Sequence, residues 1–423
     1  MLRTHNRKEV LDFMKILEIN VFNYRKGGSE AVYFSTMELL QEHGDEVVNF
    51  ALKWPENNPS PYERFFPESK ETRRGFLRPI KNIVNYFYDA EAAQKLEALI
   101  EEEKPDLAQV HLIWGQITGS ILPVLKRHHI PVIFTIHEYR IVCPAYTFRN
   151  GKGEVCEQCQ GKHFYKCITN KCCKGSYGLS AMMAAEQYFR NAFMNPAKYI
   201  DGFVYVSQFA KSKLEQYMPS LKDKPNMVLY NLTDGILQDV SETPKSEKYY
   251  LYFGRLSYEK GIKTLITAFK DAPQCRLKIA VTGPLEDELK RFVQDNKMDN
   301  VEFLGYQSGK PLQKLVSDAY FIIVPSEWYE NNPMTIIEGY AAGVPVIGAR
   351  IGGIPEIIED CKTGYLFESG NTGQLIGLIK KSSAMDKMEY MAMCDHALAF
   401  AKEHFDRNKY YPRLMDFFQK FVD

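Results

Sequence analysis

Residues 248–283, KYYLYFGRLSYEKGIKTLITAFKDAPQCRLKIAVTG, show the pattern that decides the fold. A short run rich in aromatic and aliphatic residues ends at a glycine, a helical segment follows, and a second β-rich run comes after it. The same alternation continues to residue 349 and also fills residues 15–139. Alternating strands and helices predict parallel sheets with helices on both faces, and such sheets bind their ligands at the carboxyl ends of the strands.

A polar, aperiodic segment, ILQDVSETPKSEK, interrupts the alternation and predicts a linker between two Rossmann-like, doubly wound α/β domains. A chain of 423 residues is long enough for two or three domains of about 150 residues each. We expect a tail at 1–13, an N-terminal domain at 14–235 with an irregular insert at 140–175, the linker at 236–248, a C-terminal domain at 249–405, and a helix at 406–423 that returns to the N-terminal domain.

The composition excludes some classes of function. The 53 basic residues balance the 53 acidic ones, so the chain lacks the net positive field that non-specific nucleic-acid binding needs. No apolar run approaches the ~20 residues of a membrane span, and the first residues lack the apolar core of a signal peptide. We therefore expect a cytoplasmic protein that binds no nucleic acid, with the inner face of the membrane as an alternative site of action.

A glycine pair, Gly27 and Gly28, stands between the first predicted strand and the first predicted helix. Glycine at this place lets a ligand phosphate approach the N–H groups at the start of the helix. A glycine pair that only turns the chain is an equally good interpretation.

Two cations follow the first strand of the predicted C-terminal domain. Arg255 comes directly after Gly254 at the strand end, and Lys260 precedes the next helix. At the carboxyl end of a strand, two cations can neutralise a diphosphate. Solvated surface charges are the alternative, and the position at a strand end makes this the weaker interpretation.

The segment SEWYENNPMTIIEGYAAGVPVIGARIGGIPEI, residues 326–357, carries two candidate glutamates. Pro333 lies between them and starts a helix, so Glu330 is expected in the preceding loop and Glu338 about one turn inside the helix. A loop carboxylate can accept hydrogen bonds from sugar hydroxyls, and Glu338 can reach a ribose diol. The first N–H groups of the helix then face a phosphate. Two surface charges are the alternative.

In chain order, these motifs and His137, which follows a strand, resemble the family 4 (group 1) retaining glycosyltransferases of GT-B fold. The resemblance rests on the glycine pair, on GRL and EKG within residues 254–261, and on two glutamates followed by GVPVI and GG, and it covers nearly all of residues 14–423. It implies two Rossmann-like domains that face each other across a cleft, with a nucleotide-sugar held by the C-terminal domain. It also implies catalysis without a divalent metal, because cationic side chains stabilise the leaving diphosphate.

Carried over by motif, the resemblance implies a role for each matching residue. Arg255 and Lys260 hold the diphosphate, Glu338 takes the ribose, and Glu330 takes the donor sugar. His137 points at the donor sugar near the reacting carbon, or else it is a cleft histidine without a chemical part. The implied donor-binding set further includes Gly283 and Tyr306, which line the base pocket, and Asn332, Pro333, Met334 and Thr335 at the sugar and phosphate. Gly27, Gly28 and Gly254 complete the donor-binding set.

One departure from the family pattern concerns the donor sugar. The family's usual small or aromatic–glycine pair after the first glutamate is Asn331-Asn332 in this chain. The identity of the donor sugar is therefore left open.

The insert at 140–175 contains six of the nine cysteines, including one C-x2-C pair. Thiolates can enclose a tetrahedral Zn²⁺ and so order an irregular loop. Free buried thiols are an equally good interpretation. If a metal is present, we expect it to order the loop and to leave diphosphate binding unchanged. The expected ligands of this one structural Zn²⁺ are Cys156, Cys159, Cys167 and Cys172, with Cys143 and Cys173 as substitutes.

Two segments suggest contact with an anionic or lipid-linked acceptor. The insert carries seven Lys/Arg against two Asp/Glu, a local excess of five positive charges that suits an anionic acceptor or lipid headgroups, although a solvated loop explains it equally well. Residues 73–90, RRGFLRPIKNIVNYFYDA, mix cations with aromatics. That mixture suits docking at a membrane surface, but packing against the core is the favoured interpretation.

Together these features predict a metal-independent retaining glycosyltransferase, which moves a sugar from a nucleotide diphosphate sugar to a glycan or lipid-linked acceptor in cell-surface polysaccharide synthesis. The rival enzymes are a nucleotide-sugar epimerase, which needs no acceptor, and a phosphorylase, which needs inorganic phosphate. A non-enzymatic module that binds a partner through the insert is the third interpretation. It is disfavoured because a pure scaffold has no reason to retain a diphosphate-and-sugar set.

Overall fold

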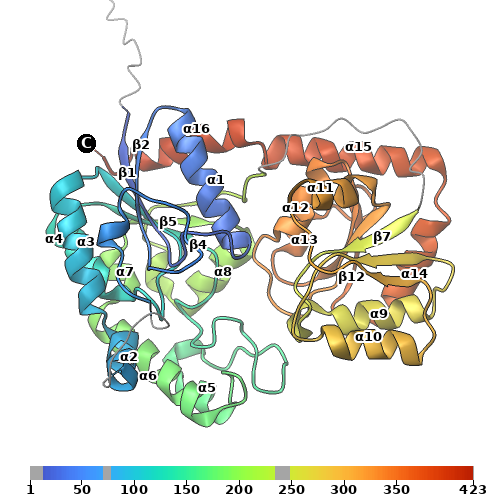
Figure 1. Ribbon diagram of the computed structural model, residues 1–423, viewed down its shortest axis with the longest axis horizontal. Coiled ribbons are helices and arrows are strands. Elements are labelled where there is room, and N and C mark those ends of the chain that lie inside the picture. The colour runs from blue at the N-terminus through green and yellow to red at the C-terminus, as the bar shows by residue number, and fades with distance from the viewer. Residues whose placement is uncertain (1–12, 70–77, 234–247, 423) are drawn as a thin grey trace, which may run out of the picture. The chain divides into compact units, whose positions relative to one another are not determined.

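The computed structural model describes residues 13–69, 78–233 and 248–422 (Figure 1). The expected tail and the expected linker lie outside these residues, apart from positions 13 and 248. Contacts divide the chain into two compact units. The first consists of Met1–Phe134, Tyr199–Asp201 and Phe418–Asp423, and the second consists of Thr135–Lys198 and Gly202–Phe417. The domain boundaries expected from the sequence stay a prediction.

The first sheet has six strands in the order β2-β1-β3-β4-β5-β6. The pairs that join β1 to β2, β1 to β3, β3 to β4 and β5 to β6 are all parallel. The strands are β1 (Lys15–Ile19), β2 (Glu46–Phe50), β3 (Leu107–Val110), β4 (Val132–Ile136), β5 (Gly202–Tyr205) and β6 (Asn226–Val228).

The second sheet also has six strands, in the order β12-β11-β10-β7-β8-β9, and its neighbouring strands pair in parallel. The prediction of two parallel, doubly wound α/β sheets is therefore confirmed. The strands are β7 (Tyr249–Tyr252), β8 (Arg276–Ile279), β9 (Val301–Phe303), β10 (Phe321–Val324), β11 (Val346–Arg350) and β12 (Gly364–Glu368).

Helices connect the strands, and many begin at a side chain that caps the free N–H groups of the first turn. The capping side chains are Asp89 at α3, Ser176 at α6, Ser207 at α8, Asn371 at α14 and Asp386 at α15. Before β7 the helices are α1 (Gly28–Glu42), α2 (Arg78–Phe87), α3 (Ala90–Glu103), α4 (Leu122–Arg127), α5 (Tyr165–Thr169), α6 (Tyr177–Phe193), α7 (Pro196–Tyr199) and α8 (Gln208–Tyr217). After β7 they are α9 (Ile262–Lys270), α10 (Glu286–Asp295), α11 (Gly309–Asp318), α12 (Met334–Ala341), α13 (Ile354–Ile357), α14 (Thr372–Ser383), α15 (Lys387–His404) and α16 (Arg407–Phe418).

The second sheet is covered on both faces, as its apolar strands require. One buried cluster joins β7 and β8 to α9, α10 and α14, and a second joins β10 and β11 to α11, α12 and α13. Figure 1 shows the two groups of helices on opposite sides of β7 and β12. Helix α15 contributes to both clusters, with Tyr390 in the first and Phe400 in the second.

A buried polar pair lies inside the first unit. The Nε2 atom of His111 and the Oε2 atom of Glu18 are 2.9 Å apart, and both side chains are fully buried. Burial raises the pKa of the Glu18 carboxyl well above its ordinary value and lowers the pKa of His111 to about 3. Burial thus favours the uncharged form of each group.

Of the two segments that suggested membrane or acceptor contact, the insert is described in full and residues 73–90 are described in part. Within residues 73–90, those up to 77 lie outside the described part, and α2 follows. Tyr86 is buried as packing predicts, whereas Ile83 and Val84 are 55% and 58% exposed. In the insert, α5 and a 3₁₀ turn at Gln160–Lys162 were not expected, because elements this short show no periodicity. Within the described ranges, no helix has both the length and the apolar composition that a bilayer crossing requires.

Candidate active site

The strand order of the second sheet brings the two donor motifs together. After β7 the chain adds β8 and β9 on one side, and then β10, β11 and β12 on the other, so β7 and β10 are neighbours where the order reverses. Open α/β sheets bind ligands at this switch point, beyond the carboxyl ends of the strands. The loop after β7 carries Arg255 and Lys260, and the loop after β10 carries Glu330.

A glycine lets these two loops approach each other. Gly261, between Lys260 and α9, has a left-handed φ of +66°, which strains any residue with a side chain. A Cβ at this position would lie 1.8 Å from the carbonyl oxygen of Pro325, so no other residue fits. The glycine in EKG is therefore a requirement of the packing between the β7 and β10 loops.

Lys260 and Glu330 form an ion pair across the switch point. The Lys260 Nζ atom lies 2.7 Å from the Glu330 Oε1 atom, and the Ser326 hydroxyl donates to the same oxygen at 2.6 Å. The Glu330 side chain is 8% exposed and that of Lys260 is 25% exposed. The Lys260 ammonium also lies 4.9 Å from the ring centroid of Trp328. Arg255, by contrast, is exposed. The two predicted cations thus stand in different environments.

The glycine pair at 352–353 holds the loop that carries Glu330. The Gly353 N–H donates to the Glu330 carbonyl at 2.7 Å. A Cβ on Gly352 would lie 2.3 Å from the Glu330 carbonyl oxygen, and one on Gly353 would lie 1.9 Å from that of Asn331. The sequence analysis identified this glycine pair as a motif. The structure explains why both residues are glycine, since two backbones approach each other closely here.

The asparagine pair that departs from the family pattern is buried and bound to backbone. The Asn331 Nδ2 group donates to the carbonyl oxygen of His137 at 2.7 Å. Asn231 donates twice to Asn332, from its N–H to the side-chain oxygen and from its Nδ2 group to the carbonyl oxygen, each at 2.9 Å. Asn331 therefore ties the Glu330 loop to the segment directly after β4, where the half-buried His137 lies.

The second glutamate lies on a separate element, as predicted. Helix α12 begins at Met334, with Pro333 as its N-cap, so Glu330 is in the loop and the half-buried Glu338 is on the helix. The first N–H groups of a helix, here those of Met334 and Thr335, have no partner inside the helix. Such N–H groups can bind an anion.

The remaining predicted donor residues lie at other strand ends. Gly283 follows β8, and a Cβ there would lie 2.6 Å from the carbonyl oxygen of Leu256, which explains the glycine by packing. Tyr306 follows β9 and is 70% exposed. The exposed pair Gly27 and Gly28 lies at the start of α1 in the first unit. The backbone of Gly27 is extended, and a Cβ on this residue would lie 3.4 Å from a Glu30 oxygen, which is an ordinary contact. Their roles in base and donor binding stay predictions.

Two cysteines of the insert lie close to each other. The Sγ atoms of Cys167 and Cys173 are 3.8 Å apart. Burial, together with the neighbouring Cys172 thiol, raises the pKa of Cys159 to about 12. In the part of the chain that the structure describes, the ligand atoms of one triad, Glu97, Glu101 and His128, lie within 4.8 Å of one another, and no three cysteines do so.

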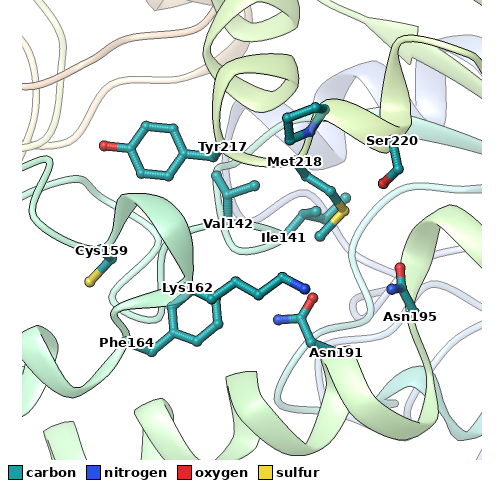
Figure 2. Close-up of a pocket in the computed structure, with 11 residues that line it drawn as sticks. Ile141, Val142, Cys159, Lys162, Phe164, Asn191, Asn195, Tyr217, Met218 and Ser220 are labelled. Carbon is teal, nitrogen blue, oxygen red and sulfur yellow. The ribbon is translucent and has the colours of Figure 1, made fainter.

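A cavity of 230 Å³ lies beside the insert. Figure 2 shows Lys162 extended toward Asn191, with Cys159, Phe164 and Tyr217 around it. Its wall combines apolar side chains, such as Ile141 and Val142, with amides and one ammonium group. This cavity was not predicted from the sequence, because its lining comes from segments far apart in the chain.

Glu356 is a residue that the sequence interpretation missed. Its carboxylate accepts hydrogen bonds from the backbone N–H groups of Gln208, at 2.7 Å, and Phe209. These are the first N–H groups of α8, so Glu356 on α13 caps another helix. The proline before it, at a helix start, was the only local signal.

Comparison with known proteins agrees with this arrangement. The family model of the group 1 glycosyl transferases matches residues 236–395, and that of glycosyltransferase family 4 matches residues 26–234. An uncharacterized glycosyltransferase of Methanocaldococcus jannaschii is 30% identical over 175 residues, which are 41% of this chain and 47% of that protein. The lipopolysaccharide 1,2-N-acetylglucosaminetransferase of Salmonella typhimurium is 29% identical over 236 residues, 51% of this chain and 62% of that protein. Each match thus spans less than two thirds of the relative's length.

Solved structures share the fold along most of the chain. The sucrose-phosphate synthase of Thermosynechococcus elongatus superposes with a TM-score of 0.71 at 18% identity, covering 96% of this chain and 98% of that one. The HepE protein of Anabaena, solved in complex with UDP-glucose, has a TM-score of 0.63 at 17% identity, covering 96% and 100%. Since the two family models together match nearly the whole of residues 26–395, the chain belongs to the group 1 glycosyltransferases of family 4, which have the GT-B fold.

Proposed function

We propose that this protein is a retaining glycosyltransferase that moves a sugar from a nucleotide diphosphate donor to a hydroxyl of a glycan or lipid-linked acceptor. The observation that carries the proposal is the Lys260–Glu330 pair, 2.7 Å apart at the switch point of the second sheet. It places a cation for a diphosphate directly beside a carboxylate for sugar hydroxyls.

The chemistry of this arrangement is mainly electrostatic. As the bond between the anomeric carbon and the diphosphate oxygen breaks, negative charge grows on the diphosphate, and Lys260, Arg255 and the first N–H groups of α12 stabilise it. The acceptor oxygen then bonds to the same carbon, and its proton passes to the departing diphosphate oxygen. In this proposal the side chains supply the charge that a divalent metal provides in other enzymes, so transfer proceeds without added metal.

Two relatives support an inference about the donor and the acceptor. HepE binds UDP-glucose, and the Salmonella relative is named for adding N-acetylglucosamine to lipopolysaccharide. We infer a UDP-sugar donor and an acceptor in cell-surface polysaccharide synthesis, used at the cytoplasmic face of the membrane. The exposed Ile83 and Val84 of α2 support peripheral contact with that surface.

Product analysis with a panel of nucleotide sugars tests this proposal. A thermal-shift screen first identifies the donor, because a ligand that binds the folded state raises the unfolding temperature. Transfer to a glycan or lipid-linked acceptor, with the donor's anomeric configuration kept in the product by NMR, is the expected result. Conversion of the donor without an acceptor indicates an epimerase, and a requirement for inorganic phosphate indicates a phosphorylase; either outcome refutes the proposal.

We further propose that thiolates of the insert hold one structural Zn²⁺, from the set Cys156, Cys159, Cys167 and Cys172 with Cys143 or Cys173 as substitutes. Four sulfurs at about 2.3 Å from an ion stand about 3.8 Å apart. The Cys167–Cys173 distance of 3.8 Å fits this spacing. The ion's chemistry would be to order the insert, with no part in transfer.

A further inference from the structure

A carboxylate of the insert forms a hydrogen bond with the loop that carries Glu330. Glu157 stands between Cys156 and Cys159, and its Oε1 atom accepts a hydrogen bond from the Tyr329 hydroxyl at 2.6 Å. Tyr329 directly precedes Glu330. The two partners are 172 positions apart in the chain, so this contact exists only in the folded protein.

Other groups hold the Glu157 carboxylate in place. The Lys213 ammonium donates to the same oxygen at 2.6 Å, and the Tyr217 hydroxyl donates to the Glu157 carbonyl at 2.9 Å. The bond from the Lys213 ammonium is charge-assisted, and hydrogen bonds of that kind are the stronger ones.

The Tyr329 ring is also fixed by aromatic packing. Its centroid lies 4.9 Å from that of Phe209 and 5.8 Å from that of Phe148, a residue of the insert. Both pairs are edge-on, the arrangement that aromatic rings prefer. Burial and the Glu157 charge raise the pKa of the Tyr329 hydroxyl, so it keeps the proton that it donates.

The insert also reaches the other donor loop. Arg149 lies 3.7 Å from the Glu259 carboxylate, and Glu259 directly precedes Lys260. The Glu259 carbonyl in turn accepts from the Glu327 N–H at 2.8 Å, which joins the two loops. The insert therefore contacts the chain on the residue before each member of the Lys260–Glu330 pair.

We propose that Glu157 is a positioning residue: through Tyr329 it holds the Glu330 loop in the geometry that binds the donor sugar. This inference rests on the proposed function, since it assigns the loop a donor. Nothing in it requires Glu157 to touch the substrate. It predicts that the insert controls recognition of the sugar, while the nucleoside diphosphate binds through groups on the loop after β7 and on α12.

The test uses Tyr329→Phe, Glu157→Gln and both together, with Glu154→Gln as the matched control. Glu154 is an exposed glutamate of the same insert, and its carboxylate accepts a local hydrogen bond from the Asn150 side chain, 2.9 Å away. Hydrogen exchange of the amides of residues 327–332 is the first readout, and it does not depend on activity. We expect about tenfold faster exchange in both single variants, because the loop loses its anchor, and no change in the control.

Kinetics with the donor supply the second readout. We expect kcat/KM for the donor to fall about tenfold in each single variant and no further in the double variant, because both remove the same contact. Affinity for the free nucleoside diphosphate should stay within twofold. Three outcomes would each overturn the positioning role. They are an unchanged exchange rate, an unchanged kcat/KM despite faster exchange, and an equal loss of affinity for the sugar donor and the free diphosphate. A parent protein that transfers no sugar from any donor defeats the proposed function instead, and the exchange result then still decides whether Glu157 anchors the loop.

Discussion

Replacing Lys260 by methionine should cost both stability and turnover, for two separable reasons. In the parent, both Lys260 and Ser326 donate hydrogen bonds to the Glu330 carboxylate, which is 8% exposed. The variant keeps the bond from the Ser326 hydroxyl, at 2.6 Å, and loses the one from Lys260. Breaking a buried ion pair by removing one partner costs about 3–5 kcal/mol. Since the Lys260 side chain is 25% exposed, water can partly replace it, and we expect a loss of about 2–3 kcal/mol.

The double variant Lys260→Met/Glu330→Gln separates the two effects. A neutral amide can still accept from Ser326, so the unfolding temperature should recover most of the drop of about 5–10 °C expected for the single variant. Turnover should stay about 100-fold below the parent in both, because neither can stabilise the leaving diphosphate with Lys260; about 3 kcal/mol of transition-state stabilisation corresponds to this factor.

Lys263→Met is the matched control for this experiment. Lys263 is three positions further on, its side chain is 57% exposed, and it pairs at 2.6 Å with the exposed Glu288. Exposed pairs contribute little, so both stability and turnover should match the parent within about 0.5 kcal/mol and twofold. Single-turnover rates of Lys260→Met within threefold of the parent would refute the diphosphate role. A double variant no more stable than the single one would refute the buried-charge argument.

Three further predictions concern other parts of the molecule. By calorimetry, Glu338→Ala should weaken binding of the nucleoside diphosphate, whereas Glu330→Ala should spare it and weaken the sugar-bearing donor; the opposite pattern means that the two roles are reversed. Elemental analysis of protein purified without added zinc should give about one zinc per chain. A chelator should then expose thiols of the insert without changing the affinity for the diphosphate. Freely reactive thiols and no bound metal would disprove the zinc site. Burial raises the pKa of Glu18, so its contribution to stability is present below the unfolded value of 4.5 and is lost as the pH rises through the folded pKa. Between these two pKa values, Glu18→Gln should gain stability relative to the parent by about 1.4 kcal/mol per pH unit in denaturant titrations, and the gain should level off above the folded pKa. A pH-independent difference would contradict the burial of an ionisable Glu18.

Local sequence patterns were enough to predict the fold class and the position of each candidate donor residue along the chain. Strand-to-helix alternation has a local cause, since the hydrophobic period changes from two residues to 3.6 within a few positions. Pro333 likewise places Glu330 in a loop and Glu338 on a helix, because proline starts helices but does not continue them. Such features are set by neighbouring residues and can be predicted without the rest of the chain.

Only the tertiary structure decided which of these residues meet. Lys260 and Glu330 are 70 positions apart and become partners because β7 and β10 are adjacent in the sheet, which depends on the strand order. The contacts of Gly261 with Pro325, of Gly353 with Glu330 and of Glu157 with Tyr329 have the same origin. Each of these contacts joins loops that follow different strands. No local pattern encodes such a contact, because its free energy comes from groups that meet only after the sheets and their helices have packed.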